Sequence, residues 1–324
     1  MKTLLLRKIG FSGTTGDDRS PESFPFPAAM TSIMEYLKED LPVETIHAHG
    51  RSYTRRRGNL DFVAASGIGF ALLWDRNLCF SAMDLLQAAP YDRGIANAFA
   101  WAGWEYEQVK GEIMRSKAVA AIDKGIPLIA LGLTDVPEAA LICGYDQDGE
   151  TLIGWSHFQE GMQTIENGMF QKSGWQDSTW MLIIPTRRVG RSFTLPNLLV
   201  VGVEIMSQSQ IEGYLAGDAA YAAWRTAIED AAEENEAFYQ YHHNILFNLA
   251  EARAWCGDFL KGSGVKAGRH FHHIHNLCWE ADAAAPNAAA MAQSENRKKL
   301  LAVMDQIRKE DQAALEELKR EALA

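Results

Sequence analysis

The stretch AALICGYDQDGETLIGW, residues 139–155, decides the fold of the first half of the chain. It contains two apolar runs, 139–146 and 151–155, on either side of the turn dipeptide Asp148-Gly149. Two such runs joined by a short Gly-containing turn are typical of a β-hairpin. The stretch therefore predicts neighbouring antiparallel strands.

The flanking sequence extends this hairpin into a sheet with helices. Apolar spacing predicts helices over 28–37, 95–104 and 118–124, and the continuous apolar run 128–133 predicts a buried strand. A second pair of strands is expected at 168–172 and 180–185. Several strands in succession favour a partly antiparallel α+β sheet, and neither GxGxxG nor GxxxxGK[ST] occurs.

The second half of the chain has apolar residues three and four positions apart almost throughout, which predicts a helical bundle. We expect a mixed domain over 1–195 and an all-helical domain over 196–324. The helices are predicted at 209–215, 219–232, 237–259, 267–281 and 287–323, with Gly217, Gly257, Gly262, Gly264 and Pro286 at their ends.

Charge and composition restrict the function. A formal net charge of -11 argues against nucleic acid and against an anionic membrane surface. No run approaches the roughly 18 apolar residues of a membrane span, and the N-terminus lacks a signal-peptide pattern. The four cysteines are widely spaced and form no CxxC pair, which favours reduced thiols and a cytoplasmic location.

Several motifs together carry a family resemblance. They are Phe26-Pro27 before a helix, the segments 66–70 and 73–74, Pro137-Glu138 before 142–146, residues 154–159, and the helical stretches 219–224 and 249–253. With these the chain resembles uncharacterised bacterial proteins related to the N-terminal domain of the butirosin-biosynthesis acyltransferase. That domain is a distant relative of the papain-like, bacteriocin-processing cysteine peptidases.

The resemblance implies a papain-like cysteine-peptidase-type domain followed by a helical bundle. Papain-like chemistry needs a cysteine at the start of the first long helix and a histidine on a following strand. This sequence has Pro27-Ala28-Ala29 at the first position and 138–141, Glu-Ala-Ala-Leu, at the second. The resemblance therefore favours a pseudoenzyme that binds a small molecule or peptide, or acts as an accessory module.

The alternative is an active enzyme for acyl transfer or amide hydrolysis with a relocated nucleophile. Cys79 lies near Arg76, which would favour the thiolate, and Ser156 directly precedes His157, a candidate acid or base. Neighbours on a strand point to opposite faces, so Ser156 and His157 are not expected to pair directly. Cys143, in an apolar strand, is expected to be buried and inert.

Aromatic and polar residues of the first domain are candidates for ligand binding. Aromatic side chains could line a pocket for an apolar or acyl group, although most aromatic residues belong to cores. The residues expected to contact a ligand are Trp74, Tyr145, Asp146, Trp155 and Gln159.

A histidine-rich segment, 270–275, suggests a third alternative, a metal-binding helical module. On a helix His270 and His273 share one face, whereas His272 and His275 share another, and i, i+3 pairs can bind zinc or iron. HExxH is absent, so a polar helix face is the competing interpretation. We expect no obligatory cofactor, with a divalent metal as the alternative, and a homodimer through the last helix as a further alternative.

Overall fold

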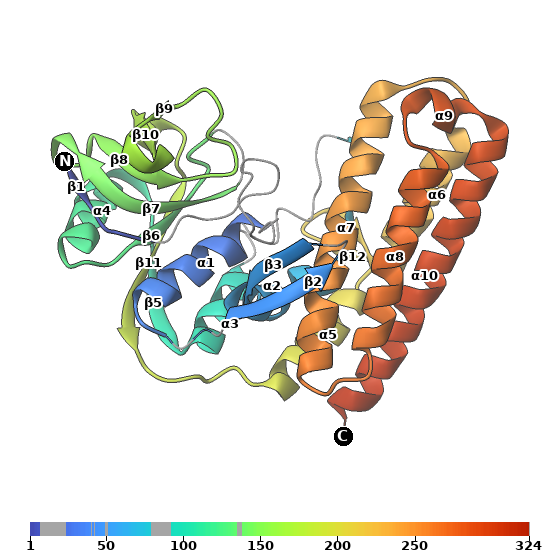
Figure 1. Ribbon diagram of the computed structural model, residues 1–324, viewed down its shortest axis with the longest axis horizontal. Coiled ribbons are helices and arrows are strands. Elements are labelled where there is room, and N and C mark those ends of the chain that lie inside the picture. The colour runs from blue at the N-terminus through green and yellow to red at the C-terminus, as the bar shows by residue number, and fades with distance from the viewer. Residues whose placement is uncertain are drawn as a thin grey trace. The chain divides into compact units, whose positions relative to one another are not determined.

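The chain divides into two compact units. The computed structural model describes residues 1–6, 24–39, 41, 43–48, 51–78, 92–134 and 138–323. The first unit comprises Met1–Phe62 and Gln87–Phe193, and the second comprises Val63–Leu86 and Thr194–Ala324. The first unit is mixed α+β and the second is mainly helical (Figure 1). The expected boundary at 195/196 lies beside Thr194, but residues 63–86 belong to the second unit.

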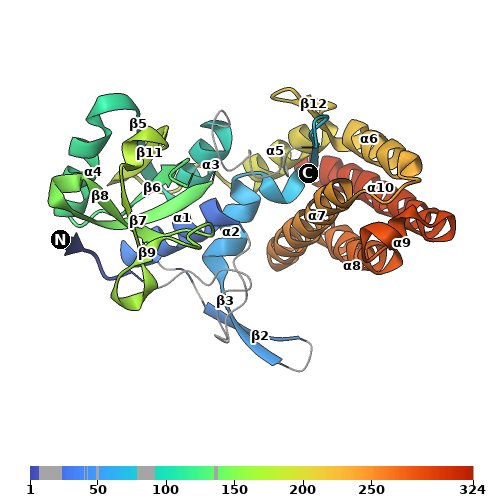
Figure 2. The same cartoon turned by 90° about the horizontal axis from the view of Figure 1, so that it is seen from above.

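An antiparallel sheet forms the centre of the first unit. Its order is β5-β11-β6-β7-β8-β10-β9, with β1 also paired to β7, and all of these described pairs are antiparallel. The strands are β1 Lys2–Thr3, β5 Trp104–Val109, β6 Leu128–Leu131, β7 Ala139–Asp146, β8 Thr151–Trp155, β9 Gln163–Thr164, β10 Phe170–Ser173 and β11 Met181–Arg188. A separate ribbon, β2 Val43–Ala48 and β3 Arg51–Arg56, extends from the helix that follows it (Figure 2).

The predicted hairpin of β7 and β8 is confirmed. Leu141 pairs with Trp155 and Asp146 with Thr151, and the turn residues 147–149 all have positive φ. At Gly154 a Cβ would lie 1.9 Å from the carbonyl oxygen of Leu141, so no larger residue fits between the strands.

The prediction of a second strand pair was wrong in its partners. Strands form near both predicted segments, but β10 pairs with β8 and β9, whereas β11 lies between β5 and β6. The first five residues of β11 are all buried, which suits a central strand covered on both faces. Local sequence predicts a strand but does not choose its partner.

Three helices contact this sheet, namely α1 Pro25–Tyr36, α3 Asp92–Ala102 and α4 Met114–Asp123. A further helix, α2 Arg57–Ala65, spans the boundary between the two units. Proline suits the first turn of a helix, and α1 begins three residues earlier than expected, at Pro25. Short 3₁₀ turns connect the elements at η1 Ile68–Phe70, η3 Gly111–Ile113, η4 Gln147–Gly149, η5 Glu166–Gly168 and η6 Trp175–Asp177.

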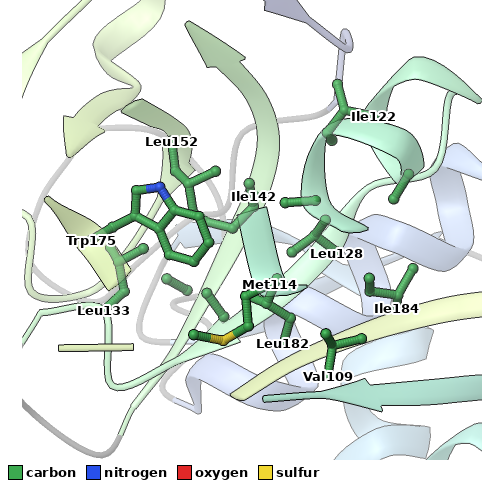
Figure 3. Close-up of a cluster of buried hydrophobic side chains, with 14 of the residues drawn as sticks. Val109, Met114, Ile122, Leu128, Leu133, Ile142, Leu152, Trp175, Leu182 and Ile184 are labelled. Carbon is green, nitrogen blue, oxygen red and sulfur yellow. The ribbon is translucent and has the colours of Figure 1, made fainter. Parts of the chain in front are cut away.

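The hydrophobic core of the first unit fills the space between α4 and one face of the sheet (Figure 3). Alternate strand residues such as Leu128, Ile142 and Leu182 point into it. Trp175 is completely buried there, and its Nε1 donates to the carbonyl of Gly149 at 2.9 Å. Helix α1 contacts β6 and β7, and all residues of β6 and the first six of β7 are buried. The central strands are therefore covered on both faces.

The second unit is built mainly from packed helices. Helix α8 packs against α7 and α10, and α10 also contacts α5 and α6. The helices are α5 Leu195–Ser207, α6 Gly217–Asp230, α7 Glu236–Gly262, α8 Gly268–Ala284, α9 Ala288–Ala292 and α10 Ser294–Ala322, and a small sheet joins β4 Leu73–Trp74, β12 Gln210–Ile211 and β13 Tyr214–Ala216.

Two expectations for this unit need correction. Residues 209–215 form the β12–β13 hairpin instead of a helix, because Glu212 and Gly213 both have positive φ and close a two-residue turn. Gly257 lies inside α7, not at its end. There the backbones of α7 and α8 come close: a Cβ on Gly268 would lie 2.8 Å from the oxygen of Gly257.

A buried ion pair joins α7 to α10, and its arginine also contacts the segment after α2. Arg253 of α7 is fully buried, and its Nε and Nη2 each donate to a carboxylate oxygen of Asp311 at 3.0 Å. Its Nη1 also donates to the carbonyls of Gly69 and Ala71, at 2.6 and 3.2 Å. This guanidinium therefore holds residues 69–71 against the bundle.

The last helix is part of this bundle. Its apolar seam is buried against helices of the same unit, so it is not an open coiled-coil surface. The buried residues of α10 are Leu300, Met304, Ile307, Asp311, Ala314 and Leu318.

Candidate functional site

Four strands end or begin at one edge of the main sheet. Leu131 at the end of β6 pairs with Ala139 at the start of β7 and with Met181 at the start of β11. Leu141 of β7 pairs with Trp155 at the end of β8. The residues directly outside these strand ends, which include Glu138 and Ser156, therefore gather at this edge, called here the β6–β8 edge.

Helix α1 points its N-terminus toward the β6–β8 edge. Tyr36, the last residue of α1, has its hydroxyl 3.9 Å from where a Cβ on Gly125 would be, just before β6 begins. Because α1 also contacts β6 and β7, its first residue, Pro25, lies toward the opposite ends of these strands. Residues 24–30 are all buried, and no side chain caps the helix start.

The two segments singled out by the sequence analysis lie at this edge. Residues 27–29 belong to the start of α1, and residues 138–141 lead into β7. Glu138 is 5% exposed and its backbone carbonyl accepts from the amide of Gly132 at 3.2 Å. The edge therefore presents a buried carboxylate.

Ser156 and Gln159 shape the turn that follows β8. The Oγ of Ser156 accepts from the amide of Phe158 at 3.1 Å. The amide group of Gln159 accepts from the nitrogen of Ser156 at 3.1 Å and donates to the carbonyl of Gly168 at 3.0 Å. The side-chain oxygen and nitrogen of Gln159 thus both stabilise the turn. Gln159 therefore has a structural role in addition to the predicted binding role.

His157 is the histidine of this turn. Burial lowers its pKa to about 4, because the charged ring would lose hydration. The ring is therefore neutral at pH 7 and a weak base, unlike a general base tuned near the working pH.

The described cysteines are poor nucleophiles. The thiol of Cys143 is fully buried, and it contacts the carbonyl of Ile153 at 3.7 Å and the sulfur of Met169 at 3.4 Å. Burial raises the pKa of Cys143 to about 12, and burial also raises the pKa of Cys256 and Cys278. The expectation that Cys143 is buried is confirmed. Cys79 lies outside the described residues.

The predicted ligand-binding residues do not form one group. Tyr145 and Asp146 lie at the far end of β7, about 20 and 23 Å from Ala139 at 3.3 Å per residue. The hydroxyl of Tyr145 donates to Asp123 at 2.9 Å, and Asp146 pairs with the amino group of Met1 at 2.8 Å. That amino group and the amide of Gln147 lower the pKa of Asp146.

The two predicted tryptophans belong to different units. Trp155 ends β8 at the β6–β8 edge and is 4% exposed. Trp74 belongs to the second unit, where it stacks with Trp224 at 6.1 Å and meets Tyr241 edge-on at 5.0 Å. Trp74 is therefore a core residue of that unit, as most aromatic residues are.

The histidines of α8 divide between two faces, as their spacing predicted. His270 and His273 face α10, where their Nδ1 atoms lie 2.7 and 3.3 Å from the same oxygen of Glu310. His272 and His275 face α7: His272 lies 3.1 Å from Asp258, and Nδ1 of His275 lies 2.9 Å from the carbonyl of Ala250.

Glu310 is the residue of this group that sequence reasoning missed. Its side chain is 23% exposed. Burial raises the pKa of Glu310, but hydrogen bonds from His270 and His273 outweigh this, so the pKa is lowered overall. Among the described residues, no group of three His, Cys, Asp or Glu side chains could hold a metal ion.

Comparisons with known proteins add no family to this description. No family model matches the chain, and no curated protein is significantly similar to it. Within the described part of the chain, none of the helices has the length and apolar character needed to cross a membrane.

Proposed function

We propose that the first unit is a papain-like domain that has lost its cysteine and histidine and serves as a binding or accessory module for a small molecule or peptide. The observation that carries this proposal is the β6–β8 edge. There the start of α1 carries Pro27-Ala28-Ala29 without a cysteine, and the segment 138–141 that leads into β7 is Glu-Ala-Ala-Leu without a histidine. A thiolate mechanism has neither of its groups at these positions.

The surrounding groups favour binding over catalysis. His157 is a weak base because its pKa is lowered to about 4, and Ser156 holds the turn through the amide of Phe158. No described cysteine has an accessible, acidic thiol, because Cys143, Cys256 and Cys278 are all buried. A carboxylate at a strand edge binds hydrogen-bond donors and cations, so the ligand class we favour carries an amine or amide.

Ligand-induced stabilisation tests the proposal. The full chain is melted alone and with a panel of acylated amines and short peptides, because a ligand that binds only the folded state raises the melting temperature. A binder should lose affinity at least tenfold in Glu138→Gln, which removes the charge and keeps the shape. Asp123→Asn is the matched control, because Asp123 bonds to Tyr145 at the far end of β7.

Turnover separates binding from the enzyme alternative. We expect no hydrolysis of activated esters or amides above the uncatalysed rate. Turnover that disappears in Cys79→Ser or Ser156→Ala would instead establish a relocated nucleophile. The absence of any stabilising ligand, or equal affinity in Glu138→Gln, would contradict a binding site at the β6–β8 edge.

A further inference from the structure

The first unit contains a small cavity beside the last turn of α1. Its volume is about 50 Å³, which is room for roughly three or four water molecules or a chemical group of that size. The cavity lies away from the β6–β8 edge, because Met34 on its wall is about 14 Å along α1 from Pro25. Its apolar walls come from Met34, Leu41 and Phe62, and its charged groups from Glu39, Asp61 and Arg191.

Asp61 presents to this cavity a carboxylate whose burial is only partly compensated. Its side chain is 13% exposed, and Nε of Arg57 lies 3.7 Å from its Oδ1. Burial raises the pKa of Asp61, and the opposing effects of Arg57, Trp101 and Arg191 do not cancel this rise. A further cationic hydrogen-bond donor in the cavity would therefore stabilise the ionised carboxylate.

Glu39 adds a second carboxylate, which two other side chains hold in place. Nε1 of Trp104 donates to its Oε1 at 2.9 Å, and Nη2 of Arg188 donates to its Oε2 at 2.8 Å. The side chain of Glu39 is 14% exposed, whereas that of Arg188 is 68% exposed. Each carboxylate oxygen can accept more than one hydrogen bond, so Glu39 can also accept from a donor in the cavity.

Arg191 brings an oriented guanidinium to the same cavity. Its Cζ lies 4.2 Å from the centre of the Trp101 ring, and its Nε donates to the carbonyl of Trp101 at 2.8 Å. Among the described residues, none bonds to the two Nη groups of Arg191. Parallel N–H groups of a guanidinium match the two oxygens of a carboxylate, so this side chain is suited to bind one.

We infer that this cavity binds a small α-amino acid, with the carboxylate of the ligand on Arg191 and its ammonium group between Asp61 and Glu39. Arg191 is exposed, so the ligand carboxylate lies at the mouth and the rest of the ligand inside. The volume suits only the smallest amino acids, such as glycine and alanine. A simple amine would leave Arg191 unused, and a simple carboxylate would meet two carboxylates without a positive charge of its own. The cavity is separate from the β6–β8 edge, so this inference does not rest on the proposed function.

The test uses the full chain with L-alanine as the probe, measured by calorimetry and by nuclear magnetic resonance of the indole N–H signals. We expect L-alanine to bind and to shift the signal of Trp101, assigned with Trp101→Phe, because this side chain lines the cavity. Ethylamine lacks the carboxylate of alanine, and propionate lacks its ammonium group. Each should bind at least tenfold more weakly than L-alanine.

Variants of the two charged groups test their separate roles. Arg191→Gln and Asp61→Asn should each weaken L-alanine binding at least tenfold. Arg187→Gln is the matched control and should leave binding unchanged, because Arg187 is 70% exposed and pairs with Glu105 at 2.6 Å. Circular dichroism of each variant without ligand checks that it is folded. If Asp61→Asn does not fold, Arg191→Gln decides, because an exposed side chain is replaced there.

Three results would overturn the inference. The first is failure of L-alanine to bind at millimolar concentration, and the second is equal affinity for L-alanine and either of its two analogues. The third is equal affinity in Arg191→Gln and the wild type. Loss of binding in Glu138→Gln together with this third result would place the ligand at the β6–β8 edge instead.

Discussion

Removal of the charge on Asp311 should strongly destabilise the helical unit. Asp311→Asn leaves the guanidinium of Arg253, which is 0% exposed, without its counter-ion. Breaking a buried ion pair from one side costs about 3–5 kcal/mol, because the remaining charge has neither water nor an opposite charge beside it. For a domain of about 150 residues, this corresponds to a fall in melting temperature of about 6–20 °C.

An exposed pair on the same helix is the control. Arg308 of α10 forms two 2.6 Å contacts with Asp218, as close in geometry as the buried pair, but Asp218 is 56% exposed. Exposed ion pairs contribute about 0.2–1 kcal/mol, so Asp218→Asn should change stability by no more than that.

Urea unfolding followed by far-ultraviolet circular dichroism measures both variants. The helical signal reports mainly on the second unit, because most of the long helices belong to it. The reasoning that burial decides the strength of these ion pairs would be refuted by either of two results. One is a decrease in unfolding free energy below about 1 kcal/mol for Asp311→Asn, and the other is an equal decrease for the two variants.

Further predictions concern thiols, pH and backbone packing. In the native chain Cys143, Cys256 and Cys278 should resist a thiol reagent at pH 8, since burial raises each pKa; labelling as fast as in urea, read by mass spectrometry, would contradict this. Burial, with a smaller effect of the neighbouring His243, lowers the pKa of His242 to about 3, so only the unfolded state takes up this proton between pH 6.5 and 3. Stability from this residue is complete above pH 6.5 and falls by about 3 kcal/mol on acidification to pH 4.5, and His242→Gln should reduce this loss of unfolding free energy in urea titrations. Gly154→Ala should unfold the first unit at lower urea than wild type, because its Cβ would meet the oxygen of Leu141 at 1.9 Å; an unchanged midpoint would show that the strands can separate without cost.

Local pattern was sufficient where neighbouring residues decide the conformation. The β7–β8 hairpin follows from its turn dipeptide, and the long helices of the second unit follow from apolar spacing. The shared face of His270 and His273 is a consequence of helical periodicity alone. These features depend on residues within about ten positions of one another, so the sequence contains the whole signal.

The conformation of short segments was harder to predict, because one turn residue can outweigh an apolar pattern. Residues 209–215 have helical apolar spacing, yet the positive φ of Glu212 and Gly213 makes them a hairpin. The candidate site at the β6–β8 edge was anticipated only as a departure from a family pattern. Strand register decided which residues lie beside this edge. It also decided how far Tyr145 and Asp146 lie from it.

What only the tertiary structure decided is which distant segments meet. The sequence alone determined the α+β first half, the helical second half and the absence of a cysteine at the start of α1. The placement of β11 between β5 and β6, of Trp74 in the second unit and of Glu310 beside two imidazoles came from packing. Strand partners, burial and the pKa of a side chain such as His157 depend on atoms contributed by segments far away in the chain, and no local pattern contains their positions.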